Sequence, residues 1–310
     1  MTELTESAKG PDAATASTAA AANNTAEPAP ARITQWGEIR HRFMANKLAV
    51  VGLVLVGLLF IVAAAAPLIA THDPYAQNLG NTLADPSGEH WFGTDALGRD
   101  QFSRIIYGSR IAVIVGLASI FLACVIGCIL GALSGYFGKA VDSVIMRVAD
   151  IFFAFPLLIG AIVIILVMGR GVLPVIVSLA VFSWATVARL LRSSILSVRE
   201  MDYVTAAKAL GASTTRIILR HIMPNSIAAV MSYVSFSVGT AVVAEASLSF
   251  LGIGVSPEVP EWGNMISSAR DFLGVKDFLW VYPSSAIVLT VLGFVFVGDG
   301  LRDALDPKLR

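Results

Sequence analysis

One carboxylate in this 310-residue sequence stands in surroundings where a charge costs free energy. Glu245 is the only charged residue in the apolar run 241-AVVAEASLSF-250. A carboxylate in such a run could line a path through the protein or pair with a positive group across a subunit interface. It could also be a packing carboxylate whose hydrogen bonds are satisfied inside the chain. The sequence leaves these alternatives open.

A second group of charges precedes another apolar run and contains Asp95, Arg99, Asp100 and Arg104. Asp100 and Arg104 are four residues apart, and we expect them to form an ion pair on a short helix. The group could form a surface that meets another protein or closes a gate. Alternatively, it could be a solvated face that shapes the entry into the next helix.

Other residue types that bind metals or nucleotides lack the necessary spacing. His90, like His41 and His221, has no partner at ligand spacing, so no metal site is expected. Cys124 and Cys128 share a helix face in an apolar run and are interpreted as packing residues. The sequence contains no Gly-x-x-x-x-Gly-Lys-Ser/Thr loop, and we therefore expect no ATP site on this chain.

The elements that position these residues are predicted to be membrane helices. The chain is 56% hydrophobic and only 14% charged, and a net charge of zero gives no reason to expect a nucleic-acid partner. A helix needs about 20 mostly apolar residues to cross the hydrocarbon of a lipid membrane. The runs that meet this length, or approach it, are 48–70, 111–138, 151–169, 171–188, 226–254 and 278–298.

Basic residues predict the orientation of these spans. With both termini inside, 16 of the 22 Lys and Arg residues lie in inner segments. This topology places 71–110 and 255–277 outside and 197–225 in the cytoplasm. At the inner surface we expect an ion pair between Arg147 and Asp150. We also expect a basic amphipathic segment, 36–47, that lies on the inner leaflet.

The inner segment 203-YVTAAKALGASTTRIILRHIMPN-225 is too polar to cross the membrane. Apolar residues recur at helical spacing over 200–211, and Asp202 could cap this helix. Gly211 stands where a helix ends in a left-handed residue, and Ser213 could cap a second helix over 214–221. Pro224 would restrain the exit into the fifth span. The alternative is an amphipathic hairpin that rests on lipid headgroups.

This segment resembles the EAA loop of ABC importer permeases. Ala206-Ala207, three residues, Gly211, and a proline thirteen residues later match that motif. Thr205, His221 and Met223 stand where the motif has Glu, Ile and Leu. Further stretches resemble the dipeptide and oligopeptide branch of the family: 92-FGTDALGRDQFSRIIYGSR-110, 245-EASLSFLGIGV-255, 262-WGNM-265 and 298-GDGLRDALDPKLR-310. The matches extend from about residue 36 to the end, and the chain resembles a C-type permease subunit.

The resemblance implies an all-α integral membrane protein of six transmembrane helices, with the type I importer fold. Its expected divisions are a disordered cytoplasmic tail (1–34), an N-terminal permease region (35–108), the permease domain (109–299) and a cytoplasmic C-terminal tail (300–310). In the family the loop 199–225 is the coupling helix, which docks on an ATPase subunit. The resemblance assigns this coupling to Tyr203, Val204, Ala206, Ala207, Leu210, Gly211, Ala212 and Pro224.

The resemblance also implies the partners and the cargo. The partners are a homologous B-type permease, two cytoplasmic ATPase domains that hold ATP and Mg²⁺, an extracytoplasmic substrate-binding protein and membrane lipid. The chain itself would be non-catalytic, carry no cofactor and lie in a bacterial inner or plasma membrane. Dipeptides and oligopeptides are the expected cargo. Alternatives are nickel complexes, haem or another small solute, and a secondary transporter is a less favoured class.

Overall fold

The helices of this protein follow the apolar runs of its sequence, and the computed structural model describes residues 35–305. The predicted tail 1–34 and the last residues, 306–310, lie outside the described part. Within it, the only strand-like pairing is an isolated bridge between Thr94 and Asp100. The expected all-α class is therefore confirmed. The helices are α1 (Gln35–Ala45), α2 (Lys47–Ala64), α3 (Ala66–Ile69), η1 (Leu79–Asn81), α4 (Gln101–Phe137), α5 (Lys139–Ala154), α6 (Leu157–Met168), α7 (Val172–Val198), α8 (Asp202–Ala209), α9 (Thr214–Arg216), η2 (Ile217–Ile222), α10 (Met223–Phe250), α11 (Trp262–Ala269), η3 (Arg270–Phe272) and α12 (Phe278–Leu305).

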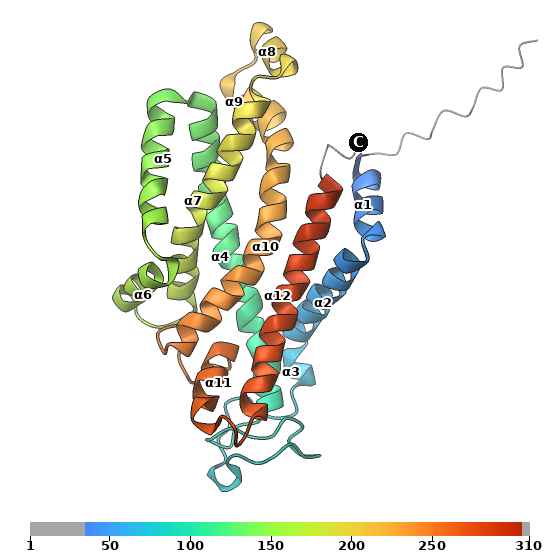
Figure 1. Cartoon of the computed structure of the whole chain (residues 1–310), viewed down its shortest axis with the longest axis vertical. Helices are drawn as coiled ribbons and strands as arrows, with labels where there is room; N and C mark the ends of the chain where they lie inside the picture. Colours follow the sequence, from blue (N-terminus) through green and yellow to red (C-terminus); the bar gives the residue numbers. More distant parts are fainter. Residues whose placement is uncertain (1–34, 306–310) are drawn as a thin grey trace, which may run out of the picture.

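The chain runs back and forth along the long axis of the molecule (Figure 1). One end carries α8, α1 and the last turns of α12, and we call it the hairpin end. The other end carries α11 and the loop between α3 and α4, and we call it the loop end. Five described helices are long and apolar enough to cross a membrane: α2, α4, α7, α10 and α12.

The predicted third span, 151–169, is not one straight helix. It is divided between α5 and α6, which meet at an angle of 92° and form either a broken span or a re-entrant loop. The break falls at Phe155 and Pro156, which have extended backbone angles. Proline disfavours helical geometry in the residue before it, which accounts for the break. Counted as one broken span, the pair gives the six predicted crossings.

Small residues allow the helices to approach closely. A Cβ atom added at Gly127 of α4 would lie 2.6 Å from the Cβ of Val187 of α7. One turn later, a Cβ atom at Gly131 would lie 2.7 Å from the carbonyl oxygen of Ala188. A small residue at every fourth position is a common device for packing membrane helices.

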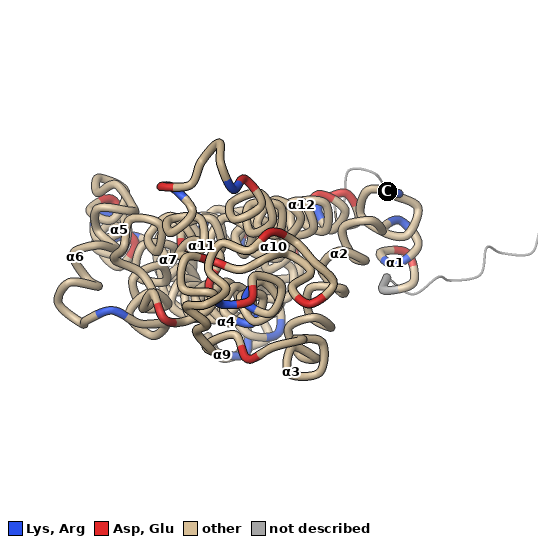
Figure 2. Tube along the Cα trace, turned by 90° about the horizontal axis from the view of Figure 1, so that it is seen from below, with Lys and Arg blue, Asp and Glu red and all other residues tan. Residues whose placement is uncertain are grey.

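At the hairpin end, α1 packs beside the last turns of α12. Asn46, between α1 and α2, donates a hydrogen bond of 3.2 Å to Asp303 of α12. Figure 2 shows α1 and α2 at one edge of the bundle, with α5 and α6 at the opposite edge. The segment 36–47 was predicted to lie along the inner leaflet. In Figure 1 this segment stands next to the end of α12, and its contact with the leaflet stays a prediction.

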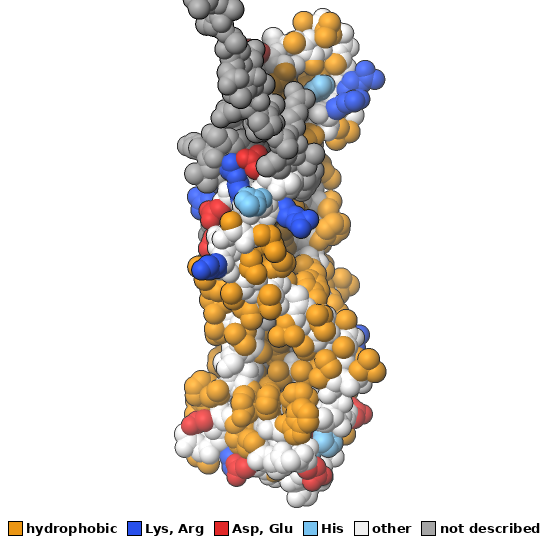
Figure 3. All heavy atoms as spheres, turned by 90° about the vertical axis from the view of Figure 1, so that its right-hand side faces the viewer, with side chains coloured by type: hydrophobic (Ala, Val, Ile, Leu, Met, Phe, Trp, Pro, Cys, Tyr) orange, Lys and Arg blue, Asp and Glu red, His pale blue; other side chains and the backbone are white. Residues whose placement is uncertain are grey.

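The surface separates into three zones along the long axis. On the face shown in Figure 3, a broad hydrophobic band lies between two ends where charged side chains gather. Many large apolar residues of the described helices are exposed, among them Val54, Leu58 and Ile61 of α2. Lipid would cover such a surface in an integral membrane protein.

Candidate functional site

The segment between α7 and α10 folds into a hairpin that projects beyond the ends of the neighbouring helices (Figure 1). Its first arm, α8, begins at Asp202, with Met201 as the residue before the helix. Asp202 thus lies in the first turn and is not the cap that was predicted. The second arm begins at Thr214 but does not end at His221. Through η2, a π-helical turn, it continues directly into α10.

The turn between the two arms has the predicted geometry. Gly211 has a φ of +77°, the left-handed region that favours glycine. The N–H of Ala212 donates to the carbonyl of Ala207 at 3.1 Å. The hydroxyl of Ser213 accepts a hydrogen bond of 3.4 Å from the N–H of Arg216. The sequence therefore predicted both the end of the first arm and the cap of the second.

Val204 attaches the hairpin to the rest of the molecule. Its side chain is completely buried in a cluster with Ile195 of α7 and with Ile217 and Ile222 of η2. Ala212 packs at the edge of the same cluster. Val204 was assigned to the coupling residues; its side chain faces inward, and its part in coupling stays a prediction. Both residues hold the hairpin in shape from within.

Four of the predicted coupling residues are exposed on the hairpin. Leu210 is 88% exposed, Tyr203 is 44% exposed, and Ala206 and Gly211 are exposed beside them. Ala207 is half-buried, and Pro224 is exposed in the first turn of α10. An apolar side chain as exposed as Leu210 is commonly part of an interaction surface when other apolar groups surround it. We call Tyr203, Ala206, Leu210 and Gly211 the hairpin tip.

Ion pairs near the hairpin end differ from the predicted pair. Asp150 of α5 pairs with Arg189 of α7 at 2.7 Å, not with Arg147. Asp142 of α5 accepts two hydrogen bonds from Arg192 of α7, at 2.5 and 2.6 Å. Each pair joins α5 to α7.

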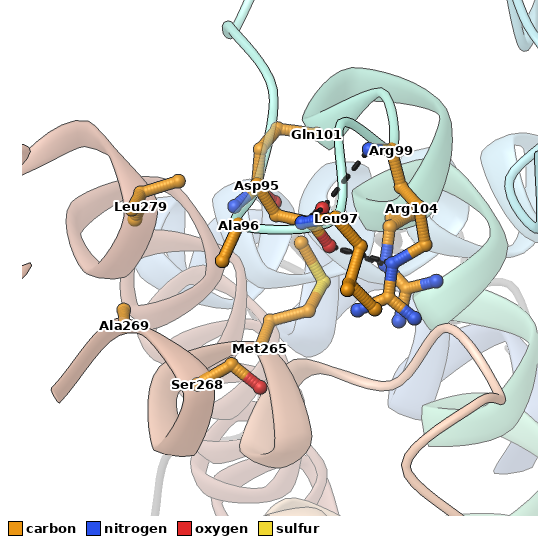
Figure 4. Close-up of a pocket in the computed structure, with 10 residues that line it drawn as sticks. All are labelled: Asp95, Ala96, Leu97, Arg99, Gln101, Arg104, Met265, Ser268, Ala269 and Leu279. Carbon is orange, nitrogen blue, oxygen red and sulfur yellow. Dashed lines mark hydrogen bonds and ion pairs between the residues drawn. The ribbon is translucent and has the colours of Figure 1, made fainter. Parts of the chain in front are cut away.

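At the loop end, the predicted group of charges is buried, so it is not a solvated face. Asp95 faces both Arg99 and Arg104, and all three line a small pocket together with Met265 of α11 (Figure 4). The carboxylate of Asp95 accepts a hydrogen bond of 2.6 Å from Nε of Arg99 and lies 4.0 Å from Nε of Arg104. Arg104 also donates to the carbonyl of Pro74 at 2.9 Å. These charges fasten the loop to the start of α4.

Asp100 does not pair with Arg104. It caps α4 by accepting a hydrogen bond of 2.8 Å from the N–H of Ser103. Its other carboxylate oxygen lies 2.8 Å from Nδ1 of His90. The predicted ion pair was wrong, because one oxygen of Asp100 caps α4 and the other faces His90 of the loop.

The structure brings two further residues to His90. His72, Glu89 and His90 each place a possible ligand atom within 4.8 Å of the other two. The premise that His90 has no ligand partners was therefore wrong. His72 lies 18 positions away, and the fold of the loop brings it close. In the sequence, the only local signal was the adjacent pair Glu89-His90.

Glu245 lies inside the chain near the end of α10 and is 1% exposed. The hydroxyl of Ser249 donates to it at 3.3 Å, and the carboxyl group of Glu261 lies beside it. Glu261 caps α11 by accepting hydrogen bonds from the N–H groups of Gly263 and Asn264, at 2.5 and 2.8 Å. Burial raises the pKa of Glu261, and these two N–H groups oppose the rise. Glu245 is thus part of a network that joins α10 to α11, and any further role stays a prediction.

Two family models match this chain. Residues 123–310 match the binding-protein-dependent transport system inner membrane component, and residues 34–86 match the N-terminal transmembrane domain of oligopeptide transport permease C. The first match covers more than half of the chain.

Curated relatives match at nearly full length. The chain is 40% identical to the dipeptide transport system permease protein DppC of Alkalihalophilus pseudofirmus and to the oligopeptide transport system permease protein OppC of Bacillus subtilis. Each of these matches covers 90% of this chain and 91% of the relative. It is 41% identical to the glutathione transport system permease protein GsiD of Pectobacterium atrosepticum, over 89% of this chain and 92% of the relative.

A solved structure has the same fold. The inward-facing methionine ABC transporter MetNI matches with a TM-score of 0.54 and 18% identity, over 66% of this chain and 96% of that one. At this identity the likeness concerns the fold alone. Together, the family match, the relatives and the helical architecture show that this chain belongs to the family of binding-protein-dependent transport system inner membrane components and is a permease with the type I ABC importer fold.

Proposed function

We propose that this chain is the C-type permease subunit of an ATP-driven importer that carries dipeptides and oligopeptides into the cytoplasm. Relatives that are 40% identical over 90% of the chain and are named for these cargoes support the proposal. The relative named for glutathione supports the same chemical class, because glutathione is itself a small peptide. None of these three relatives is named for nickel or haem.

The observation that carries the coupling role is the form of the hairpin. Its tip presents exposed apolar and small side chains, and its base is fixed to α7 and η2 through the buried Val204. A force applied to such a tip passes to α7 and α10, because η2 continues into α10 without a break. We therefore propose that the hairpin tip docks on a cytoplasmic ATPase subunit and moves with it.

The complete importer would contain a homologous B-type permease, two ATPase domains that bind ATP and Mg²⁺, and an extracytoplasmic substrate-binding protein. This chain would contribute half of the path and would itself catalyse no reaction. In this arrangement the hairpin end and both termini face the cytoplasm of a bacterial cell. The excess of Lys and Arg at predicted inner positions supports this orientation.

Uptake by cells with and without this chain tests the proposal. Labelled dipeptide, tetrapeptide, glutathione, nickel and haem are offered in parallel, and plasmid-borne wild type serves as the rescue control. We expect the deletion to abolish uptake of at least one peptide and the plasmid to restore it. Loss of nickel or haem uptake with all peptides unaffected would overturn the cargo. Peptide uptake that persists after ATP is depleted, while the proton gradient across the membrane is maintained, would overturn the ATP-driven mechanism.

A further inference from the structure

Three side chains at the loop end have the composition of a transition-metal site. His72 follows α3, while Glu89 and His90 lie late in the same loop, and each offers a ligand atom within 4.8 Å of the other two. The centroids of the two imidazole rings lie 4.6 Å apart, and the ring planes are tilted by 32°. Two histidines and one carboxylate form a ligand set that proteins use for zinc, and it leaves the fourth position open.

Asp100 contacts one of these histidines and fixes the orientation of its ring. Its carboxylate lies 2.8 Å from Nδ1 of His90, and both side chains are buried. In neutral His90, a proton on Nδ1 would donate to this carboxylate and would leave the lone pair of Nε2 for a metal. The carboxylate–histidine pair is the usual arrangement behind a metal-bound imidazole. Asp100 also lies 3.7 Å from Nδ1 of His72, so one carboxylate faces both rings.

The site is also accessible. The side chain of His72 is 36% exposed and Glu89 is exposed, whereas the side chain of His90 is only 10% exposed. An ion could therefore enter from solvent and meet one buried and two more mobile ligands. The carboxylates of Glu89 and Asp100 would offset its charge.

We propose that His72, Glu89 and His90 bind one divalent transition-metal ion of the zinc class at the loop end of this chain. The bound ion would join the start of the loop to its end, and through Asp100 both would be joined to the first turn of α4. This site would fix the shape of the loop independently of the cargo.

Zinc binding by the purified full-length chain tests this proposal. The chain is prepared in lipid nanodiscs with an affinity tag that contains no histidine, and Zn²⁺ is titrated calorimetrically at pH 7.5. The variants are His72→Gln and Glu89→Gln, both at exposed or half-exposed positions where folding is tolerant. His41→Gln, an exposed histidine of α1, is the matched control. Thermal unfolding with and without Zn²⁺ supplies a second readout.

We expect one Zn²⁺ per chain in the wild type and in His41→Gln. Each of the two site variants should weaken zinc binding by at least about 10-fold. Removing a residue that only orients a metal ligand already weakens metal affinity by about that factor, and here the ligand itself is removed. Zinc should also raise the Tm of the wild type and of the control, but not of the site variants. Absence of stoichiometric binding to the wild type would overturn the proposal. Unchanged affinity in either site variant, or loss of binding in His41→Gln, would overturn it as well.

Discussion

Replacing Val204 with alanine should weaken the packing of α8 against α7 and η2, while the membrane helices stay folded. Val204 is the only buried residue of α8, and its side chain is 0% exposed. The substitution removes two buried carbon atoms, at about 0.8 kcal/mol each, and leaves a small cavity. We therefore expect the attachment of α8 to weaken by about 1.5–2.5 kcal/mol.

Hydrogen exchange measures this loss at the amides of α8. Leu210 N–H, for example, is bonded to the carbonyl of Ala206 at 3.0 Å and exchanges only when the turn opens. A weakening of about 1.5–2.5 kcal/mol should speed this exchange by about 10- to 70-fold. Coupling should fall as well, with ATP hydrolysis continuing while peptide uptake declines.

Val175→Ala is the matched control, because Val175 is equally buried but belongs to a separate cluster near the start of α7. It should leave exchange in α8 unchanged. If Val204→Ala left the α8 amides as protected as in the wild type, the hairpin would not depend on this contact. If both variants accelerated α8 exchange equally, the effect would be general destabilisation, and the reasoning would fail.

Further substitutions test the hairpin and the α10–α11 junction. Leu210→Ala should leave thermal stability within about 0.5 kcal/mol yet weaken ATPase binding in a pull-down titration, because Leu210 is 88% exposed. Gly211→Asp should abolish uptake at normal membrane expression, and unchanged uptake would contradict docking there. Glu245→Gln should leave uptake unchanged, since its contacts lie within the chain, whereas a loss would place it on the path or at an interface. Gly263→Ala should lower thermal stability by about 1–3 kcal/mol, because the added Cβ would lie 2.2 Å from the carbonyl oxygen of Ala246, and a wild-type Tm would refute this.

The sequence predicted the elements that local physics determines. Long apolar runs became α2, α4, α7, α10 and α12. The turn at Gly211 and the cap at Ser213 were also predictable, because both depend on the backbone preferences of single residues. The break between α5 and α6 was missed, although Pro156 marked it. The apolar run 151–169 was interpreted as one continuous span, and the effect of Pro156 on the residue before it was overlooked.

Partners of charged residues were predicted poorly, because they come from distant parts of the chain. Asp150 was assigned to a neighbour in its own helix but pairs with Arg189, 39 positions away. Asp100 was assigned to Arg104 but contacts His90 instead. Helical spacing identifies residues that could meet, and the packing of other elements decides which contacts form.

The direction of side chains on the hairpin was only partly predictable. Val204 and Leu210 were both assigned to coupling, yet Val204 faces its own cluster while Leu210 faces outward. The assigned residues are therefore divided between the inside and the outside of the hairpin. The packing of η2 against α8 cannot be read from the sequence. For this reason the sequence did not distinguish the residues that hold the hairpin together from those exposed at its tip.

Site-specific cross-linking from Leu210 tests the central claim most directly. Cys124 and Cys128 are first replaced by alanine, and single cysteines are then placed by Leu210→Cys and, as the matched control, Leu68→Cys. Both leucines are 88% exposed, but Leu68 lies in α3, toward the loop end. In native membranes we expect a bifunctional thiol–amine reagent to link the cysteine at 210 to an ATPase subunit and the one at 68 to none. A chain that forms no ATPase adduct from position 210, or an equal one from position 68, would contradict docking at the hairpin tip.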